Sequence, residues 1–326
     1  MIEIIQPGIM TTVQDLGRYG YRNIGVATSG AMDISALKIA NCLVGNVAEA
    51  AALEIALTGI QLRFHADMLV SLTGIDVQAE LDGVPFPTWW ALKVKAGQTL
   101  TTSMQKKGMY SYLAFQGGID VPMIMGSRST DLKGGFGGHC GRCLKPNDRL
   151  SVLSVPGQDE VNSHIGIDAR KLGLLNEEEQ EGTLIRIICA AEWQEYPKQM
   201  QETFLSSKWK IMPDSSRMGY RLSGPEIKKD TPKELLSHGI LPGTVQLPPS
   251  GQPIIQLNDA NTCGGYPKLG VVIAADMRKL AQTYIGHHIR FSIITREEAI
   301  IVEQKRQDFF RNLDSRFKYI RNITSY

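Results

Sequence analysis

Two neighbouring segments, MLVSLTG at residues 68–74 and VQAELDG at residues 77–83, indicate the fold class of this 326-residue chain. Each has the composition and length of a short strand, and the second ends in Asp82-Gly83, a dipeptide that favours a tight hairpin turn. Similar strand-like runs between turn residues occur at 110–115, 149–155, 184–188, 219–222, 254–257, 269–274 and 288–294. The sequence therefore predicts a mainly β protein with a few helices.

The clearest helix is predicted from Asp33 to Val44. Its apolar residues share one face, the Asp33 side chain can accept hydrogen bonds from the free amides of the first turn, and Gly45 can end the helix. Shorter helices are predicted at 197–205 and 276–283.

Length and composition indicate two β-rich lobes. A chain of 326 residues is longer than the ~100–200 residues of one usual core, and 32 Gly with 15 Pro indicate many turns. We place the first lobe at 1–160 and the second at 184–296. The stretch between them contains the acidic run Glu177-Glu178-Glu179, and such a stretch buries too little apolar surface to form a core. Residues 161–183 are therefore predicted to be a linker.

The C-terminal segment, 297–326, has the period of an amphipathic helix. Its apolar residues recur at helical spacing among charged ones, namely Val302, Phe309, Phe310, Leu313, Phe317 and Ile320. Two uses of this apolar side remain open. It can pack on the body of the chain or on a second copy, which would make a homo-oligomer, or it can dock a specific partner.

Charge and hydropathy argue against several classes of function. A formal net charge of +2 offers no basic face for nucleic acid. No run approaches the ~20 apolar residues of a membrane-spanning helix. The opening residues, MIEIIQPG, lack the regions of a signal peptide, and five cysteines without such a signal indicate reduced thiols. We therefore expect a cytoplasmic protein that binds neither nucleic acid nor membrane.

Common catalytic motifs are not found in the sequence. It has no G-x-x-x-x-G-K-[ST] loop for nucleotide phosphates, no G-x-S-x-G elbow and no H-E-x-x-H helix. Cys140 and Cys143 have C-x-x-C spacing beside His139, but no second pair of ligands follows at a spacing typical of zinc. We interpret these thiols as incidental residues of a glycine-rich loop and predict no metal site.

The segment 117–142 concentrates glycine and polar residues with little pattern for a core, as in GGIDVP (117–122), GSRSTD (126–131) and GGFGGHCGR (134–142). A connection of this length in a compact domain is usually functional or disordered, and its apolar residues favour order. Glycine lets backbone amides approach an anion, and Arg128 and Arg142 can each bind a carboxylate or phosphate through two hydrogen bonds. The alternative is that Arg128 only pairs with Asp131 across the loop.

A second polar cluster lies on both sides of a predicted strand, with QLPPSGQP (246–253) before it and NDANTCGGYP (258–267) after it. Polar side chains at a strand end in a β-barrel are well placed for a small polar ligand. We interpret Asn258 and Asn261 as turn residues and Gln252, Asp259 and Thr262 as candidates for a ligand site.

These segments resemble the biotin-dependent carboxyltransferase family, long labelled allophanate hydrolase subunit 2. The resemblance rests on a collinear series of motifs over about residues 1–295, including TTVQDLGR (11–18), GAMD (30–33), ALEI (52–55), GSRSTD (126–131) and SRMGYRL (216–222). It implies a tandem of cyclophilin-like β-barrel lobes.

Members of this family include a subunit of the bacterial ATP-dependent 5-oxoprolinase, in which three separate subunits open 5-oxoproline to L-glutamate while ATP is hydrolysed. This chain has no Ala-Met-Lys-Met segment for covalently bound biotin and is too short for a carboxylase or carrier domain. The resemblance therefore favours a 5-oxoprolinase subunit that is inactive without two partner subunits. ATP would bind at an unknown place in the complex.

Opening a lactam with ATP implies what the site contains. Phosphorylation of the amide oxygen would activate the carbonyl, which calls for cationic and amide donors and for a carboxylate that activates water. We expect Arg128, as a catalytic residue, and Arg142 to hold anionic groups, with Asp131 or Asp259 as the acid and base. The candidate residues for binding the substrate are Gln14, Arg142, Gln252, Thr262, Gly264, Gly265 and Tyr266.

Two other activities share the same lobes in this family. One is a regulatory protein that binds a kinase inhibitor without any turnover. The other is a carboxyltransferase that acts on carboxybiotin, as in urea carboxylase. The sequence leaves all three interpretations open.

Overall fold

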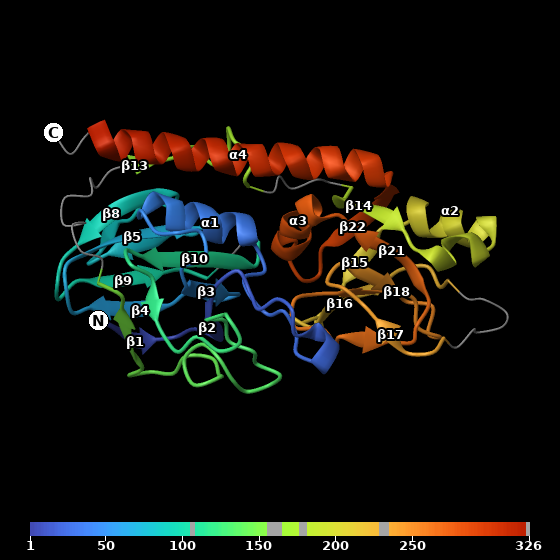
Figure 1. Ribbon diagram of the computed structural model, residues 1–326, viewed down its shortest axis with the longest axis horizontal. Coiled ribbons are helices and arrows are strands. Elements are labelled where there is room, and N and C mark those ends of the chain that lie inside the picture. The colour runs from blue at the N-terminus through green and yellow to red at the C-terminus, as the bar shows by residue number, and fades with distance from the viewer. Residues whose placement is uncertain (105–107, 155–164, 176–180, 228–234, 324–326) are drawn as a thin grey trace. The chain divides into compact units, whose positions relative to one another are not determined.

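The computed structural model describes residues 1–104, 108–154, 165–175, 181–227 and 235–323. The chain forms two compact units, which Figure 1 shows with their strands and helices labelled. The first unit comprises Met1–Tyr19, Ser29–Leu175 and Phe309–Tyr326, and the second comprises Gly20–Thr28 and Asn176–Asp308.

The first unit is built on two β-sheets. A seven-stranded sheet has the order β11-β12-β1-β4-β9-β6-β7, and a six-stranded sheet has the order β13-β8-β5-β10-β3-β2. The strands of the former are β1 (Ile2–Gln6), β4 (Gln61–Phe64), β6 (Ala79–Leu81), β7 (Val84–Pro85), β9 (Thr99–Thr102), β11 (Ile119–Asp120) and β12 (Arg149–Val152). Those of the latter are β2 (Met10–Gln14), β3 (Ala52–Ala56), β5 (Met68–Thr73), β8 (Trp90–Val94), β10 (Tyr110–Phe115) and β13 (Ile165–Gly166). Apolar side chains from both sheets, such as Phe64 and Leu113, form one continuous core.

The hairpin predicted at Asp82-Gly83 is confirmed. The two residues connect the antiparallel strands β6 and β7, with φ of 50° at Asp82 and 80° at Gly83. Positive φ at both central positions matches the right-handed twist of the flanking strands, which is why this dipeptide favours a hairpin.

Helix α1 (Ile34–Leu43) confirms the helix predicted between Asp33 and Val44. The Asp33 side chain accepts a hydrogen bond from the Ala36 amide at 3.0 Å, and Gly45 follows the end with φ of 80°. The helix packs on β5 and β10 of the six-stranded sheet.

The second unit contains a closed seven-stranded barrel of order β14-β21-β18-β19-β16-β15-β22, in which β14 pairs with β22 in parallel. Its strands are β14 (Thr183–Cys189), β15 (Trp209–Ile211), β16 (Gly219–Ser223), β18 (Thr244–Gln246), β19 (Ile254–Gln256), β21 (Lys268–Val272) and β22 (His288–Ile293). A separate ribbon pairs β17 (His238–Gly239) with β20 (Cys263–Gly264). The helical elements are η1 (Arg22–Ile24), η2 (Ala191–Glu195), α2 (Lys198–Ser206), η3 (Ala274–Asp276) and α3 (Met277–Gln282).

The mainly β fold with a few helices is confirmed, as is the predicted C-terminal helix, which is α4 (Arg296–Ile323). The second unit has the predicted barrel, whereas the first unit has two separate sheets where a second barrel was expected. The described part of the chain has no helix long and apolar enough to cross a membrane.

The predicted linker at 161–183 differs from the observed arrangement. Residues 165–175 belong to the first unit, because β13 pairs with β8 at the edge of the six-stranded sheet. The acidic run Glu177-Glu178-Glu179 lies outside the described residues. The short segment Gly20–Thr28 belongs to the second unit although the sequence around it belongs to the first.

Candidate functional site

A row of polar side chains crosses the six-stranded sheet of the first unit. The strand register pairs Thr12 of β2 with Glu54 of β3, Glu54 with Tyr112 of β10, and Tyr112 with Thr73 of β5. Residues paired in this way point to the same face of a sheet. Helix α1 covers this face, where the Thr73 hydroxyl donates to the Ala36 carbonyl at 2.8 Å. These four residues (Thr12, Glu54, Tyr112 and Thr73) are called the polar row below.

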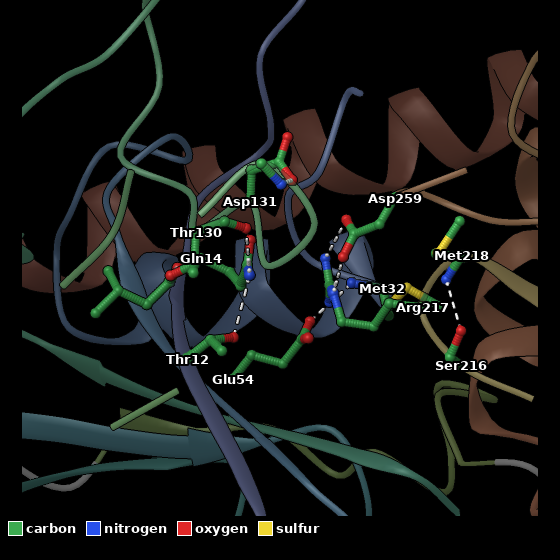
Figure 2. Close-up of polar contacts among 12 residues, drawn as sticks. Thr12, Gln14, Met32, Glu54, Thr130, Asp131, Ser216, Arg217, Met218 and Asp259 are labelled. Carbon is green, nitrogen blue, oxygen red and sulfur yellow. Dashed lines mark hydrogen bonds and ion pairs between the residues drawn. The ribbon is translucent and has the colours of Figure 1, made fainter. Parts of the chain in front are cut away.

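Glu54 is the buried carboxylate of the polar row, with 2% of its surface exposed. Its Oε2 accepts hydrogen bonds from the Met32 amide at 2.8 Å and from the Tyr112 hydroxyl at 2.7 Å (Figure 2). The Tyr112 hydroxyl in turn accepts from the Asp33 amide at 2.7 Å. Burial, and then the nearby Glu54 carboxylate, raise the pKa of Tyr112, so the phenol stays protonated and donates to Glu54.

The sequence places Glu54 within a family motif but did not lead us to select it as a site residue. The available signal was a carboxylate in the middle of the apolar run Ala52-Leu53-Glu54-Ile55, because ionised residues are rarely buried unless they are paired or functional.

Gln14 lies at the end of β2, two residues after Thr12 and on the same face. Its side chain is fully buried, and Nε2 donates to the Thr12 hydroxyl at 3.1 Å and to the Thr130 carbonyl at 3.2 Å (Figure 2). The predicted site residue Gln14 is therefore next to the polar row and in contact with the GSRSTD segment at 126–131.

Asp15 ties the GSRSTD segment to β2. Its carboxylate accepts from the Ser127 hydroxyl at 2.6 Å, the Ser129 hydroxyl at 2.5 Å, the Arg128 amide at 2.5 Å and the Gly17 amide at 2.8 Å. The first three bonds join residues more than 110 positions apart. Asp15 therefore positions the loop that carries Arg128, a role that no local sequence pattern indicates.

The glycines at 137 and 138 let the chain approach itself closely. A Cβ atom on Gly137 would lie 2.2 Å from the Ser129 carbonyl oxygen, and one on Gly138 would lie 1.9 Å from the Thr130 hydroxyl. Beside them, the Arg18 guanidinium donates to the Ser129 carbonyl at 2.5 Å. The absence of a side chain at these two positions is needed for close packing of the chain. The expected approach of their amides to an anion is not what the glycines are needed for.

Arg128 and Asp131 do not form an ion pair within the described residues. The Arg128 Nε donates to the Val121 carbonyl at 3.1 Å, and Asp131, which is buried, accepts from the Gly134 amide at 2.7 Å. The simple pairing considered as an alternative is therefore not found. No hydrogen bond from the terminal nitrogens of half-buried Arg128 is found within the described residues.

Arg142 is engaged inside the first unit, contrary to its expected role. Its Nη1 and Nη2 form a two-point ion pair with Asp148 at 2.7 and 2.8 Å. This guanidinium is the main cause that lowers the pKa of Asp148 to about 2. Arg142 therefore stabilises the turn before β12, and the edge of its guanidinium that could bind a substrate is occupied by Asp148.

In the second unit, Asp259 forms a buried ion pair with Arg217. The Arg217 Nε lies 2.8 Å from Oδ2 and its Nη2 lies 3.1 Å from Oδ1, with both side chains 3% exposed (Figure 2). The backbone amide of Asp259 also donates to the Arg217 carbonyl at 3.1 Å. The buried ion pair and this hydrogen bond together hold the loop after β19. The predicted acid or base Asp259 is thus the counterion of an arginine.

The other predicted residues of the second unit are largely structural. Gln252 accepts from the Gly224 amide at 2.8 Å and donates to the Gly224 carbonyl at 3.2 Å. The Thr262 carbonyl accepts from the Ile240 amide at 3.0 Å, where the ribbon of β17 and β20 begins. The side chain of Tyr266 is exposed.

Gly265 has no room for a side chain, and one at Gly264 would displace the end of the Gln246 side chain. A Cβ atom on Gly264 would lie 2.8 Å from the Gln246 Nε2, and one on Gly265 would lie 2.7 Å from the Leu235 carbonyl oxygen. Both glycines therefore serve close packing of this loop.

No group of three or more His, Cys, Asp or Glu side chains is placed to hold a metal ion in the described residues. Cys140 and Cys143 do not form a disulfide with each other. Ile167 lines two cavities of the first unit, one of about 440 Å³ that Trp90 also lines and one of about 520 Å³ that Phe317 also lines, and no predicted site residue lines either. The polar row with Gln14 and the GSRSTD segment is therefore the candidate site of the first unit.

Comparison with known proteins identifies relatives of this chain. The family described as "Carboxyltransferase domain, subdomain A and B" matches residues 24–293. The chain is 46% identical to a 5-oxoprolinase subunit of Escherichia coli, over 96% of this chain and 97% of that protein. It is 39% identical to the 5-oxoprolinase subunit of the same name in Haemophilus influenzae, over 94% and 96% of the two chains.

A solved structure shares the whole fold. The urea amidolyase of K. lactis matches 96% of this chain with a TM-score of 0.88 and 31% sequence identity. The match covers 20% of the urea amidolyase chain, so this chain corresponds to about a fifth of that protein.

Proposed function

Because the chain belongs to the carboxyltransferase-domain family, we propose that it is a subunit of an ATP-dependent 5-oxoprolinase and corresponds to the subunit that the two bacterial relatives represent. The observation that carries this proposal is the similarity to these two 5-oxoprolinase subunits along almost the whole of each chain. Urea amidolyase relatives are less similar, at 32% identity or below, and the match covers 18% of those proteins.

The candidate site has groups that suit the opening of a lactam. This reaction adds water across the C–N bond of the ring and leaves a free amine and a second carboxylate. Glu54 provides a buried carboxylate for proton transfer, and Gln14 provides an amide that can orient a neutral ring. Arg128, whose Nε donates to the Val121 carbonyl, would bind the carboxylate of the substrate or a phosphoryl group through its terminal nitrogens.

We further propose that turnover requires two partner subunits and ATP. The sequence contains no P-loop, and the bacterial relatives are by name subunits, each one part of a larger enzyme. The partners would bring the ATP site or complete it.

The test compares the activity of the purified chain with that of the chain assembled with its partner subunits. We expect glutamate release from 5-oxoproline only when all subunits and ATP are present, measured by amino-acid chromatography and phosphate release. The partners alone, with ATP and 5-oxoproline, serve as the control. Rapid glutamate release by the single chain would contradict the need for partners, and an inactive but correctly assembled complex would contradict the function.

A further inference from the structure

Several buried polar atoms of the first unit have no hydrogen-bond partner in the described part of the chain, and two of them belong to neighbouring segments beside the polar row. They are Gln14 Oε1 and Ser29 Oγ, on residues that are 0% and 1% exposed. The Gln14 amide cannot simply be turned over, because its Nε2 is needed as a donor to the Thr130 carbonyl. A buried polar group left unpaired loses its hydration without any compensating bond, so two such groups on adjacent segments are candidates for bonds to a ligand.

The two atoms belong to segments that lie side by side. The Ala31 amide donates to the Asp15 carbonyl at 2.9 Å, which joins the residue after Gln14 to the residues after Ser29. Gly30 fits against the same segment, since a Cβ atom there would lie 2.6 Å from the Gly17 amide nitrogen.

Ser29 itself has φ of 52°, a conformation that residues other than glycine seldom adopt. Strained residues of this kind concentrate at functional sites, where the strain holds a side chain in place.

A lactam presents the matching pair of groups. The five-membered ring holds the amide cis, so the N–H and the carbonyl oxygen lie on the same edge and need one acceptor and one donor. Gln14 Oε1 is an acceptor and the Ser29 hydroxyl is a donor. Both are neutral, which favours an amide edge over a carboxylate or phosphate.

We propose that Gln14 Oε1 accepts the lactam N–H of the substrate and that the Ser29 hydroxyl donates to its carbonyl oxygen. This assignment rests on the proposed function. It makes Gln14 and Ser29 the residues that select a cyclic amide, with the Ser29 bond strengthening as negative charge develops on the oxygen.

The test uses the complex assembled from the full-length chain and its partner subunits. Ser29→Ala removes a hydroxyl that bonds to nothing within the described chain, so it should leave the melting temperature unchanged. We expect it to weaken 5-oxoproline binding, measured by calorimetry without ATP, by about 10- to 100-fold. The matched control is Ser71→Ala, because the Ser71 Oγ in β5 is also buried and unpartnered within the described residues. Its binding should stay within about twofold of wild type.

A second variant tests the N–H contact. Gln14→Met removes the acceptor, and the probe is the lactone analogue in which a ring oxygen replaces the N–H. The wild-type complex should bind the lactam at least about 10-fold more tightly than the lactone, since a site built for a hydrogen bond rejects the analogue that lacks it. In Gln14→Met this ratio should fall towards one.

The outcomes separate the two claims. Variants that keep wild-type lactam affinity and lactam preference, in a complex that releases glutamate, would overturn the assignment and leave the function intact. A wild-type complex without ATP-dependent glutamate release would overturn the function itself, whatever the variants do.

Discussion

Arg128 and Arg142 lie in the same glycine-rich region, and the structure gives them different partners. Arg142 forms a two-point ion pair with Asp148, whereas Arg128 donates from Nε to the Val121 carbonyl. The sequence alone does not distinguish the two arginines. Which carboxylate lies close to each guanidinium depends on how the loop folds back.

We expect Arg128→Lys to lower the turnover of the complex with little change in stability. Lysine cannot bind a carboxylate or phosphate through two parallel hydrogen bonds, so the loss in transition-state stabilisation should be about 2–4 kcal/mol, roughly 30- to 1,000-fold in kcat/KM. Steady-state kinetics and a melting curve on the same sample measure both quantities. The matched control, Arg142→Lys, should show lower stability and nearly normal turnover per folded molecule. The reverse pattern would remove Arg128 from the site.

Removing the Arg142 guanidinium should change the pH dependence of stability. The pKa of Asp148 is lowered to about 2 in the folded chain, from 3.8, chiefly by its hydrogen bonds to Arg142. A lowered pKa means that the pair stabilises the fold above about pH 4 and that this contribution is lost as the pH falls towards 2. Because solvent reaches part of the pair and screens it, we expect a contribution of about 1 kcal/mol.

The variant Arg142→Met should therefore be less stable than wild type at pH 6, with the difference in the free energy of unfolding shrinking towards pH 2. Urea unfolding at several pH values measures this difference. A difference that stays constant with pH would contradict the assignment of the Asp148 shift to Arg142.

The C-terminal half of helix α4 contacts helix α1 of the first unit through several side chains. Phe317 is 3% exposed, and the Arg321 guanidinium donates to the Cys42 carbonyl near the end of α1, where carbonyls lose their partners in the following turn of the helix. Tyr319 and Ile320 are 67% and 40% exposed. Phe317 and Arg321 therefore both contribute to positioning the C-terminal half of this helix.

We expect Phe317→Ala to release the C-terminal half of α4 from the first unit. Burying a phenylalanine contributes about 3–5 kcal/mol in a full core and less at a single contact, so we expect a loss of about 2–3 kcal/mol in local stability. Hydrogen exchange of Phe309 to Arg321 amides measures it. Tyr319→Ala is the control, with a change below about 0.5 kcal/mol because the side chain is exposed. Equal protection in both variants would show that Phe317 does not hold the helix.

The strands and helices were largely predictable from the sequence, because local patterns specify them. The Asp82-Gly83 turn and the cap at Asp33 depend on neighbours in the chain. The site was less predictable for a physical reason. Asp15 bonds to Ser127 and Ser129, and nothing in the local sequence marks residues more than 110 positions apart as partners. The Glu54 carboxylate was missed because its environment is formed by strand register and by the start of α1.

The chain passes between the two units four times, at Tyr19/Gly20, Thr28/Ser29, Leu175/Asn176 and Asp308/Phe309. The assignment of Gly20–Thr28 to the second unit rests on long-range bonds, such as those of Arg22 to the Ile240 and Asn261 carbonyls. A lobe boundary drawn from composition along the chain could not show such an exchange. A single cut therefore does not isolate either unit with all of its segments.

The two units are compact and have their own sheets, so we expect damage to one unit to leave the strands of the other protected. Asp259→Asn removes the counterion of buried Arg217, and breaking a buried ion pair costs about 3–5 kcal/mol. We expect amides of β16 and β19 to exchange faster in this variant, while those of β3 and β10 keep wild-type protection, as measured by hydrogen exchange. The control is Asp214→Asn, because the Asp214–Arg221 pair is exposed and contributes little.

If Asp259 were instead the catalytic acid or base, the Asp259→Asn variant would keep wild-type protection throughout and lose turnover in the assembled complex. The same sample therefore decides whether Asp259 stabilises the second unit or acts on the substrate.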